Sequence, residues 1–331
     1  MTEADSAARI GRGRWRKALL RLALSAAFLL VLFAFVPFGE VAAAMSRVAW
    51  PIWVAAIPTY LALHLIGVIK WRVLNNAAGA QLSFTVALRA YYAGLFGNTI
   101  MPSIIGGDVL RAAIAFNRVH SRTALIFGSA LDRGLDFLGL LALAGLGALF
   151  APQALDPRSR QVFLWVVLLL ACAMAIGALA FWSILRLGGI RRLRRHLVRL
   201  RQALRSAAGA PAAVAGAFVL GLLLQSLLVL FNAWLGRQIG IEIPLYVWFF
   251  VWPLAKLAGI APTQNGIGVR EAAQVALFAP FGVGAAAAFG TGLVFEVIII
   301  VGGLMAGILA WLLGLAYKAK TRSTALPQPP L

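Results

Sequence analysis

Long apolar runs recur along almost the whole sequence, and they restrict the chain to folds that can exist in a lipid bilayer. Of the 331 residues, 62% are hydrophobic and only 12% are charged, and the mean hydropathy is +0.90. A soluble domain normally has about 25% charged residues. A spanning helix needs about 20 apolar residues, so the hydrophobic content is sufficient for roughly six to eight helices. These values exclude a soluble enzyme and predict an all-α polytopic membrane protein.

The positive charges lie mainly between the apolar runs. Lys and Arg total 30, against 10 for Asp and Glu. In a soluble chain this excess would suggest nucleic-acid binding, but in membrane proteins bases collect in the cytoplasmic loops. We therefore expect no nucleic-acid partner. The bases place both termini in the cytoplasm, namely the basic residues 1–17 and the end of the last helix. One membrane domain is expected over residues 18–320, and the Pro-rich tail 321–331 is predicted to be disordered.

Six apolar runs are long and continuous enough to be full spans. They cover residues 18–38, 48–69, 122–150, 161–187, 211–234 and 285–317. Ala42-Ala43-Ala44 resembles a cleavage site, so a signal peptide is the alternative for the first run. That run exceeds the about 7 to 15 apolar residues of a signal peptide, and an uncleaved helix is favoured. After the second run, Lys70 and Arg72 flank Trp71, which is typical of the cytoplasmic end of a span.

Two further apolar segments are broken in the middle, at about residues 83–117 and 246–282. Pro102 to Asp108 interrupts the first segment and Pro262 to Gly268 the second. The first has bases at both ends, which places both ends in the cytoplasm, whereas both ends of the second face outward. The sequence therefore predicts two re-entrant helical hairpins that enter from opposite sides, as an inverted repeat. In transporters, such paired interrupted segments mark the substrate site.

The second half of each hairpin combines glycines with an arginine. A helix that begins inside the bilayer presents free N–H groups and the positive end of its dipole, which favours an anion. The predicted substrate-binding residues are Gly106, Gly107, Asp108 and Arg111 in the first hairpin and Gly266, Gly268, Arg270 and Glu271 in the second. The guanidinium groups suit phosphate, and the acids would neutralise them while substrate is absent. The alternative is that each Arg–acid pair only ties its hairpin to the bundle.

Other ionisable residues inside the apolar segments are candidate supporting residues. They are Asp132, Arg133, Asp136, Lys256 and Glu296. Asp132 and Asp136 share a helix face, so they can pair with Arg133 or with the hairpin arginines. A proton relay is the alternative role, but electrostatic support of the arginines is favoured.

The segment Arg186 to Arg205 is the most basic part of the chain, with eight arginines. Apolar residues recur on one of its helical faces, at Ile190, Leu193, Leu197, Leu200 and Leu204. This pattern predicts a cytoplasmic amphipathic helix on an anionic inner leaflet. A topology determinant with no further role is the alternative.

The sequence indicates neither a metal site nor a cofactor. His64, His120 and His196 lack metal-ligand spacing, the glycine-rich turns lack the Gly-Lys-Ser/Thr of a P-loop, and no serine lies in a nucleophile elbow. Cys172 is the single cysteine, which excludes an internal disulfide. The chain is therefore not expected to be an enzyme, and its oligomeric state stays open.

Several motifs resemble the lysylphosphatidylglycerol synthase transmembrane-domain family, also called flippase-like. They are Leu95-Phe96-Gly97-Asn98, Pro102 with Gly106-Gly107-Asp108 and Arg111, Leu131-Asp132-Arg133, and Pro262 to Ala273. The resemblance covers nearly the whole chain. The second glycine motif often begins Gly-Gly in that family and here begins Asn265-Gly266, which hardly changes the backbone argument.

This resemblance implies a lipid flippase in the inner (plasma) membrane of a bacterium. Bifunctional members of the family also carry a cytoplasmic aminoacyl-transferase domain, which this chain is not expected to have, so we do not expect synthesis of aminoacylated lipid. The expected substrate is an anionic phospholipid or a polyprenyl-phosphate-linked lipid. The alternatives are a membrane-embedded lipid-modifying transferase and a non-transporting scaffold for enzymes that make lipids or cell-envelope glycans.

Overall fold

The computed structural model describes residues 29–101, 106–150, 191–260, 263 and 266–323, and isolated positions in 20–27 and 161–183. Within these residues all regular structure is helical. The elements are α2 (Phe38–Ser46), α3 (Trp50–Ala77), α4 (Phe84–Ile100), α5 (Gly106–Ala115), α6 (Arg122–Leu149), α8 (Arg191–Ala208), α9 (Pro211–Ile239), α10 (Leu245–Ala258), α11 (Val269–Phe278), the 3-10 turn η2 (Ala279–Phe281) and α12 (Ala285–Ser323). The all-α prediction is thereby confirmed for the described part of the chain.

In the described residues, three helices are long and apolar enough to cross a membrane: Trp50–Ala77, Pro211–Ile239 and Ala285–Ala316. A fourth candidate is the pair Leu29–Phe35 and Phe38–Ser46, which is bent by 96°. The bend lies at Pro37, whose ring removes a backbone donor and disfavours a continuous helix. The chain is therefore an integral membrane protein. The count of six spans is not confirmed, since α6 contains three charged residues in its middle and the predicted span 161–187 lies outside the continuously described residues.

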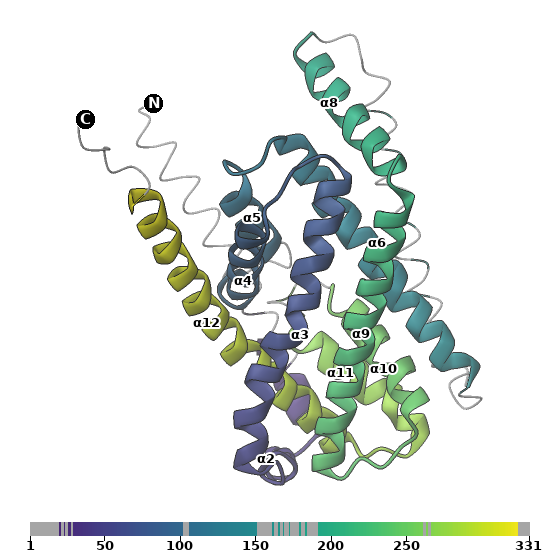
Figure 1. Cartoon of the computed structure of the whole chain (residues 1–331). Helices are drawn as coiled ribbons and strands as arrows, with labels where there is room; N and C mark the ends of the chain where they lie inside the picture. Colours follow the sequence, from purple (N-terminus) through teal and green to yellow (C-terminus); the bar gives the residue numbers. More distant parts are fainter. Residues whose placement is uncertain are drawn as a thin grey trace, which may run out of the picture.

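The helices of the bundle run between two ends of the molecule. Hydrogen bonds between residues at or near the helix termini define each end. At one end, Ser206 Oγ of α8 donates to Ala77 O of α3 at 2.8 Å, and His120 N donates to Ala80 O at 3.0 Å. At the other end, Arg47 Nη1 after α2 donates to Ile239 O of α9 at 2.9 Å. Figure 1 shows α8 at the top and α2 at the bottom. We call these the α8 end and the α2 end.

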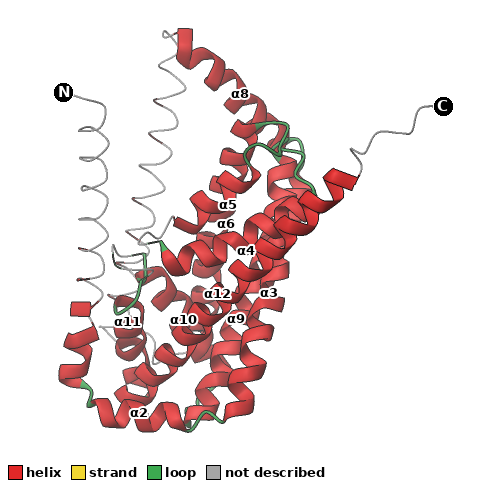
Figure 2. Ribbon diagram, turned by 90° about the vertical axis from the view of Figure 1, so that its left-hand side faces the viewer, coloured by secondary structure: helices red, strands yellow, loops and turns green. Residues whose placement is uncertain are grey.

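The two interrupted segments enter the bundle from opposite ends. The α4–α5 pair begins and finishes at the α8 end, next to Ala80 and His120. The α10–α11 pair begins just after Ile239 at the α2 end, and α12 then starts beside α2, where a β-carbon at Gly290 would lie 3.3 Å from Ala44 Cβ. Figure 2 accordingly shows α4 and α5 above α10 and α11. Residues 102–105 at the first break, and 261, 262, 264 and 265 at the second, lie outside the described residues.

Glycines allow the two arms of the first pair to touch. A β-carbon at Gly107 would lie 2.2 Å from Gly94 O, and one at Gly97 would lie 3.0 Å from Gly107 Cα. In the second pair, Gly266 has a φ of +79° and its β-carbon would meet Gly259 Cα at 2.8 Å. Both pairs are therefore closely packed helical hairpins.

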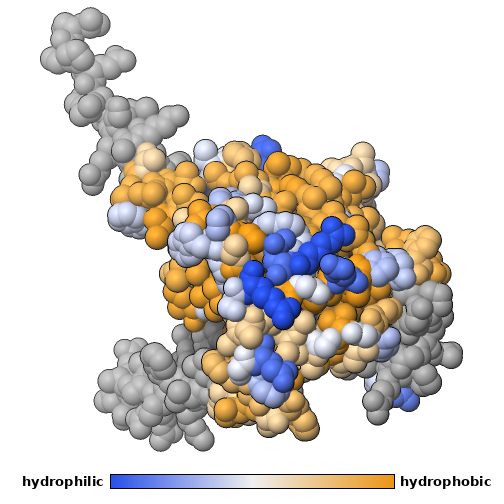
Figure 3. Space-filling model, turned by 90° about the horizontal axis from the view of Figure 1, so that it is seen from below, coloured by the Kyte–Doolittle hydropathy of each residue, from blue (hydrophilic) through white to orange (hydrophobic). Residues whose placement is uncertain are grey.

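Large aromatic residues fill the core while others remain on the outside. Trp71, Trp248, Phe250, Phe278 and Phe289 are essentially fully buried. Exposed large apolar residues include Phe35, Trp50, Leu149 and Trp311, each with more than 60% of its surface exposed. The view of the α2 end in Figure 3 shows hydrophilic residues gathered near the middle of a mostly hydrophobic surface. Such an exterior suits contact with lipid rather than water.

Candidate functional site

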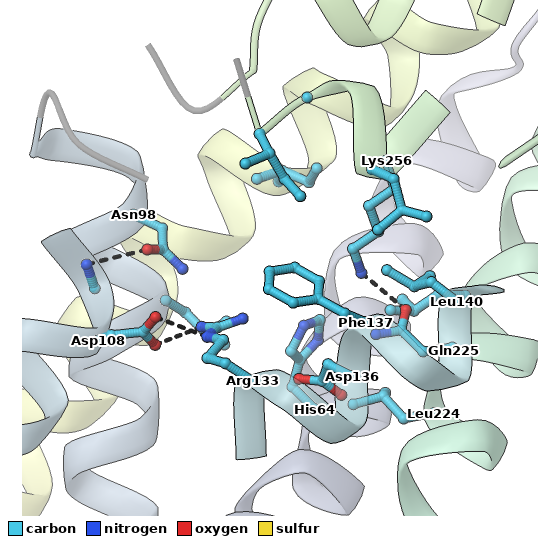
Figure 4. Close-up of a pocket in the computed structure, with 18 of the residues that line it drawn as sticks. His64, Asn98, Asp108, Arg133, Asp136, Phe137, Leu140, Leu224, Gln225 and Lys256 are labelled. Atoms are coloured by element: carbon cyan, nitrogen blue, oxygen red, sulfur yellow. Dashed lines mark hydrogen bonds and ion pairs between the residues drawn. The ribbon is translucent and has the colours of Figure 1, made fainter. Parts of the chain in front are cut away.

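A single cavity touches both hairpins. Its volume is about 660 Å³, and residues of α3, α4, α5, α6, α9, α10, α11 and α12 line it. Its charged and polar lining includes His64, Asn98, Asp108, Arg111, Arg133, Asp136, Gln225, Lys256 and Arg270. Its apolar lining includes Leu95, Phe137, Leu140, Leu224, Leu228, Leu257, Ile260, Phe295 and Ile299. Figure 4 shows Phe137 between the side chains of Arg133 and Lys256. The cavity lining therefore combines charged and apolar side chains.

The first ion cluster joins α5 to α6. Arg111 Nη2 lies 3.0 Å from Asp132 Oδ2 and 3.0 Å from Asp108 Oδ1. Arg133 Nε donates to Asp108 Oδ2 at 2.7 Å, and Arg133 Nη2 bonds the other oxygen of the same carboxylate. Arg111 and Asp132 are 4% and 1% exposed. The hairpin arginine thus pairs with α6 as the sequence suggested, whereas Arg133 pairs with Asp108 and not with Asp132 or Asp136.

Lys70 of α3 also belongs to the first ion cluster, although the sequence analysis placed it at the cytoplasmic end of a span. This placement was wrong, because α3 continues to Ala77 and the Lys70 side chain is only 2% exposed. Its ammonium lies 2.9 Å from Asp132 Oδ1 and 2.5 Å from Asp136 Oδ1. Buried residues recur every three or four positions along one face of α3, at His64, Gly67, Lys70 and Leu74, so Lys70 lies on the face that packs into the bundle.

The second ion cluster joins α11 to α12 and consists of Arg270, Glu271 and Glu296. Arg270 Nε and Nη2 donate to Glu271 Oε1 at 3.1 and 2.9 Å, and Nη2 also bonds Glu296 Oε2. Glu271 Oε2 accepts the N–H of Gly268 at 2.6 Å. Gly268 has a φ of +88°, a conformation that favours glycine. Glu271 therefore caps the start of α11 and holds the arginine at the same time.

Carboxylates already neutralise the arginines, whereas Lys256 has an uncharged partner. Lys256 Nζ donates to Gln225 Oε1 of α9 at 2.8 Å (Figure 4). Among the described residues, no carboxylate lies within ion-pair distance of this ammonium. Lys256 is thus a lining cation that has donors to spare for a ligand.

Two of the four predicted glycines, Gly107 and Gly268, use their N–H groups within the hairpins rather than for a ligand. Gly107 lines the cavity, but its N–H donates to Asn98 Oδ1 at 3.0 Å. The N–H of Gly268 is taken by Glu271. Gly106, Gly266, Gly268 and Glu271 do not appear among the lining residues, and neither do Asp132 and Glu296, which support the arginines from behind. The glycines serve the packing of the hairpins more directly than they serve a ligand.

Aromatic residues that the sequence analysis did not select complete the surroundings of the arginines. The Arg111 guanidinium lies 5.1 Å from the ring centre of Trp71 and 5.8 Å from that of Tyr91. Arg270 lies 5.9 Å from the ring centre of Trp252. Such cation–π contacts stabilise cations that have lost their water. Nothing in the hydropathy pattern separates these aromatic residues from the many others in the chain.

No group of three or more His, Cys, Asp or Glu side chains that could hold a metal ion occurs in the described part of the chain. The groups that the structure brings together around the cavity are ion pairs, amides, aromatic rings and apolar side chains.

No curated protein matches the sequence. The family model described as lysylphosphatidylglycerol synthase TM region matches residues 18–316, which is most of the chain and includes both ion clusters, both hairpins and Lys256. The chain belongs to the lysylphosphatidylglycerol synthase transmembrane-region family.

Proposed function

We propose that the chain is a lipid transporter, and not an enzyme, which moves an anionic phospholipid or a polyprenyl-phosphate-linked lipid between the leaflets of a bacterial inner membrane. The observation that carries the proposal is the cavity, since one space of about 660 Å³ is lined by both hairpins. A lipid headgroup needs charged partners and its chains need apolar ones. The cavity offers both, because Lys256 and the arginines line it together with apolar residues such as Leu140 and Leu224.

The proposed topology has six spanning helices and two re-entrant hairpins, with both termini in the cytoplasm. Three observations support it. The hairpins enter from opposite ends, described residues next to their breaks, such as Gly107 and Ile260, line the shared cavity, and α8 marks one end as basic. Irregular backbone is tolerated at membrane depth only where protein or a polar cavity covers it. The α8 end is then cytoplasmic.

The proposed partner of α8 is the anionic inner leaflet. Its described part carries Arg199, Arg201 and Arg205, and Val198 and Leu204 are 57% and 40% exposed. Apolar residues that are exposed beside arginines suit a headgroup surface. Translocation assays in vesicles with and without anionic lipid would test this contact.

The proposed anion contacts are Lys256 first and the hairpin arginines second. A phosphate can bind the Lys256 ammonium without breaking an ion pair. Arg111 and Arg270 are held by carboxylates at about hydrogen-bond distance, so a phosphate must compete with Asp108 or Glu296 for them. Substrate binding would therefore exchange partners at the arginines.

The experiment is lipid translocation by purified protein in vesicles, measured with a fluorescent phosphatidylglycerol analogue and a quencher that cannot cross the membrane. The wild type should translocate the analogue. Lys256→Gln should lower the rate at least tenfold, because an ionic contact with a phosphate is worth about 1.5–3 kcal/mol. The matched control is Arg237→Gln, which removes an exposed charge at the end of α9 and should leave the rate unchanged.

This experiment also separates the transporter from its alternatives. A scaffold or a transferase would show no translocation as a purified protein without added enzymes or donors. Wild-type rates in Lys256→Gln would refute the assignment of the anion contact, and wild-type protein without any translocation would refute the transporter.

A further inference from the structure

The charges around the cavity balance only when both ion clusters and Lys256 are considered together. The first ion cluster contains three cations and three acids, and it is neutral. The second ion cluster contains one cation and two acids, so it has one carboxylate in excess. Lys256, which lines the same cavity as Arg270, has one positive charge and no acid partner among the described residues.

The excess carboxylate is deeply buried. The side chains of Arg270, Glu271 and Glu296 are 8%, 0% and 7% exposed. An uncompensated charge at such a position costs several kcal/mol, so it needs a compensating charge nearby. Among the described residues, Lys256 lines the same cavity as Arg270 and has no carboxylate partner, which makes it the candidate for this compensation.

An anionic headgroup on Lys256 would remove that compensation. The cavity would then hold one net negative charge in a low-dielectric surrounding, which opposes binding. Uptake of one positive charge by the second ion cluster restores neutrality. We propose that Glu296 takes up one proton when an anionic headgroup binds at Lys256, so that lipid binding and proton binding are coupled. This inference rests on the proposed function and adds to it the coupling of lipid binding to proton binding.

Glu296, rather than Glu271, is the carboxylate suited to take the proton. Glu271 accepts three hydrogen bonds, two from Arg270 and one from Gly268 N. Hydrogen bonds to a carboxylate stabilise its charged form. Glu296 has one hydrogen bond in the described structure, from Arg270. Protonation of Glu296 would leave the Arg270–Glu271 pair intact.

The groups that face Glu296 support a coupled change. Arg270 and Glu271 come from α11, and Tyr60 comes from α3 within electrostatic range. The described parts of α2, α4 and α9 also pack against α12 and contribute no ion pair to Glu296. Arg270 also lies within electrostatic range of Lys256. Arg270, which bonds Glu296 and lies within electrostatic range of Lys256, therefore links the two groups.

The test measures proton uptake on binding with purified full-length protein in detergent. The probe is dihexanoyl-phosphatidylglycerol, a short-chain anionic lipid, titrated calorimetrically in buffers of different ionisation enthalpy. The wild type should take up about one proton per lipid, and its affinity should fall about tenfold per pH unit wherever Glu296 is charged in the free protein. Glu296→Gln mimics the protonated acid, so it should bind the probe without proton uptake and without the pH dependence.

The controls make each result decisive. Glu242→Gln, in the exposed loop between α9 and α10, should behave as the wild type. Wild-type binding without proton uptake would overturn the coupling while leaving the transporter in place. Unchanged proton uptake in Glu296→Gln would overturn the assignment to Glu296. If the wild type neither binds the probe nor translocates lipid, the proposed function fails and the coupling fails with it.

Discussion

Arg111 and Arg270 occupy equivalent places in the two hairpins, yet their partners differ in a way that affects their roles. Arg111 lies between Asp108 of its own helix and Asp132 of α6 in a cluster with equal numbers of acids and bases. Arg270 lies between two glutamates with no second cation. Each arginine ties its hairpin to a neighbouring helix, which is one of the two roles that the sequence offered, and the proposed phosphate contact would use the same guanidinium.

Removing Arg270 should therefore affect folding as well as transport. Arg270→Ala would leave Glu271 and Glu296 buried without their shared donor, and loss of one partner of a buried pair costs about 3–5 kcal/mol. We expect a strongly lowered thermal midpoint in detergent and no lipid translocation. The control Arg122→Ala, at an exposed position, should change neither.

A second substitution separates the two effects of Arg270. In the Arg270→Ala/Glu296→Gln double variant, one of the two stranded charges is gone, so part of the lost stability should return while translocation stays absent. A single variant as stable as the wild type would contradict the view that this cluster holds α11 to α12.

At the scale of elements, the α4–α5 pair depends on contact between backbones. The N–H of Gly107 donates to Asn98, and the Gly107 α-carbon faces Gly94 and Gly97 of α4. A side chain at this position would separate the two arms. The first hairpin is thus built around one glycine, and the cavity wall that it forms depends on that packing.

Gly107→Ala tests this packing directly. The added methyl group would lie 2.2 Å from Gly94 O and 2.2 Å from Asn98 Oδ1, and a backbone oxygen cannot yield without moving its helix. Overpacking of this kind costs about 1–3 kcal/mol or more, so the thermal midpoint should fall. Gly216→Ala is the matched control, because nothing lies within 4 Å of that position in α9, and it should gain roughly 0.5–1 kcal/mol from helix propensity. Equal behaviour of the two variants would refute the contact.

The sequence predicted elements better than it predicted contacts. Long apolar runs and their flanking bases identified α3, α9 and α12 because hydropathy depends on the segment alone. The paired breaks were found because proline and glycine act locally. Lys70 was misplaced because a basic residue after an apolar run is the same in sequence whether it meets water or buried acids. Which acid pairs with Arg133 depends on which helices pack together, and so does the lack of a carboxylate beside Lys256 among the described residues. A sequence pattern within one segment carries no information about this packing.

At the scale of the whole molecule, two hairpins from opposite ends meet around one cavity. In such an arrangement, a ligand in the centre has similar structural surroundings toward each side of the membrane. The bundle must then be oriented by features outside the repeat. The basic helix α8 and the bases near Ser83 lie at one end, whereas the other end has the short connections around Ser46 and Gly240.

The orientation gives a prediction about access from each side. In a Cys172→Ser background, Ser46→Cys lies at the α2 end and Ser83→Cys at the α8 end, and both positions are exposed. A membrane-impermeant maleimide should label Ser46→Cys in intact spheroplasts, whereas Ser83→Cys should react only in inside-out vesicles. Labelling after solubilisation controls for intrinsic reactivity. Reaction of both positions from the same side would mean that the two hairpins do not enter from opposite faces of the bilayer, and the inverted repeat could not serve as a path between leaflets.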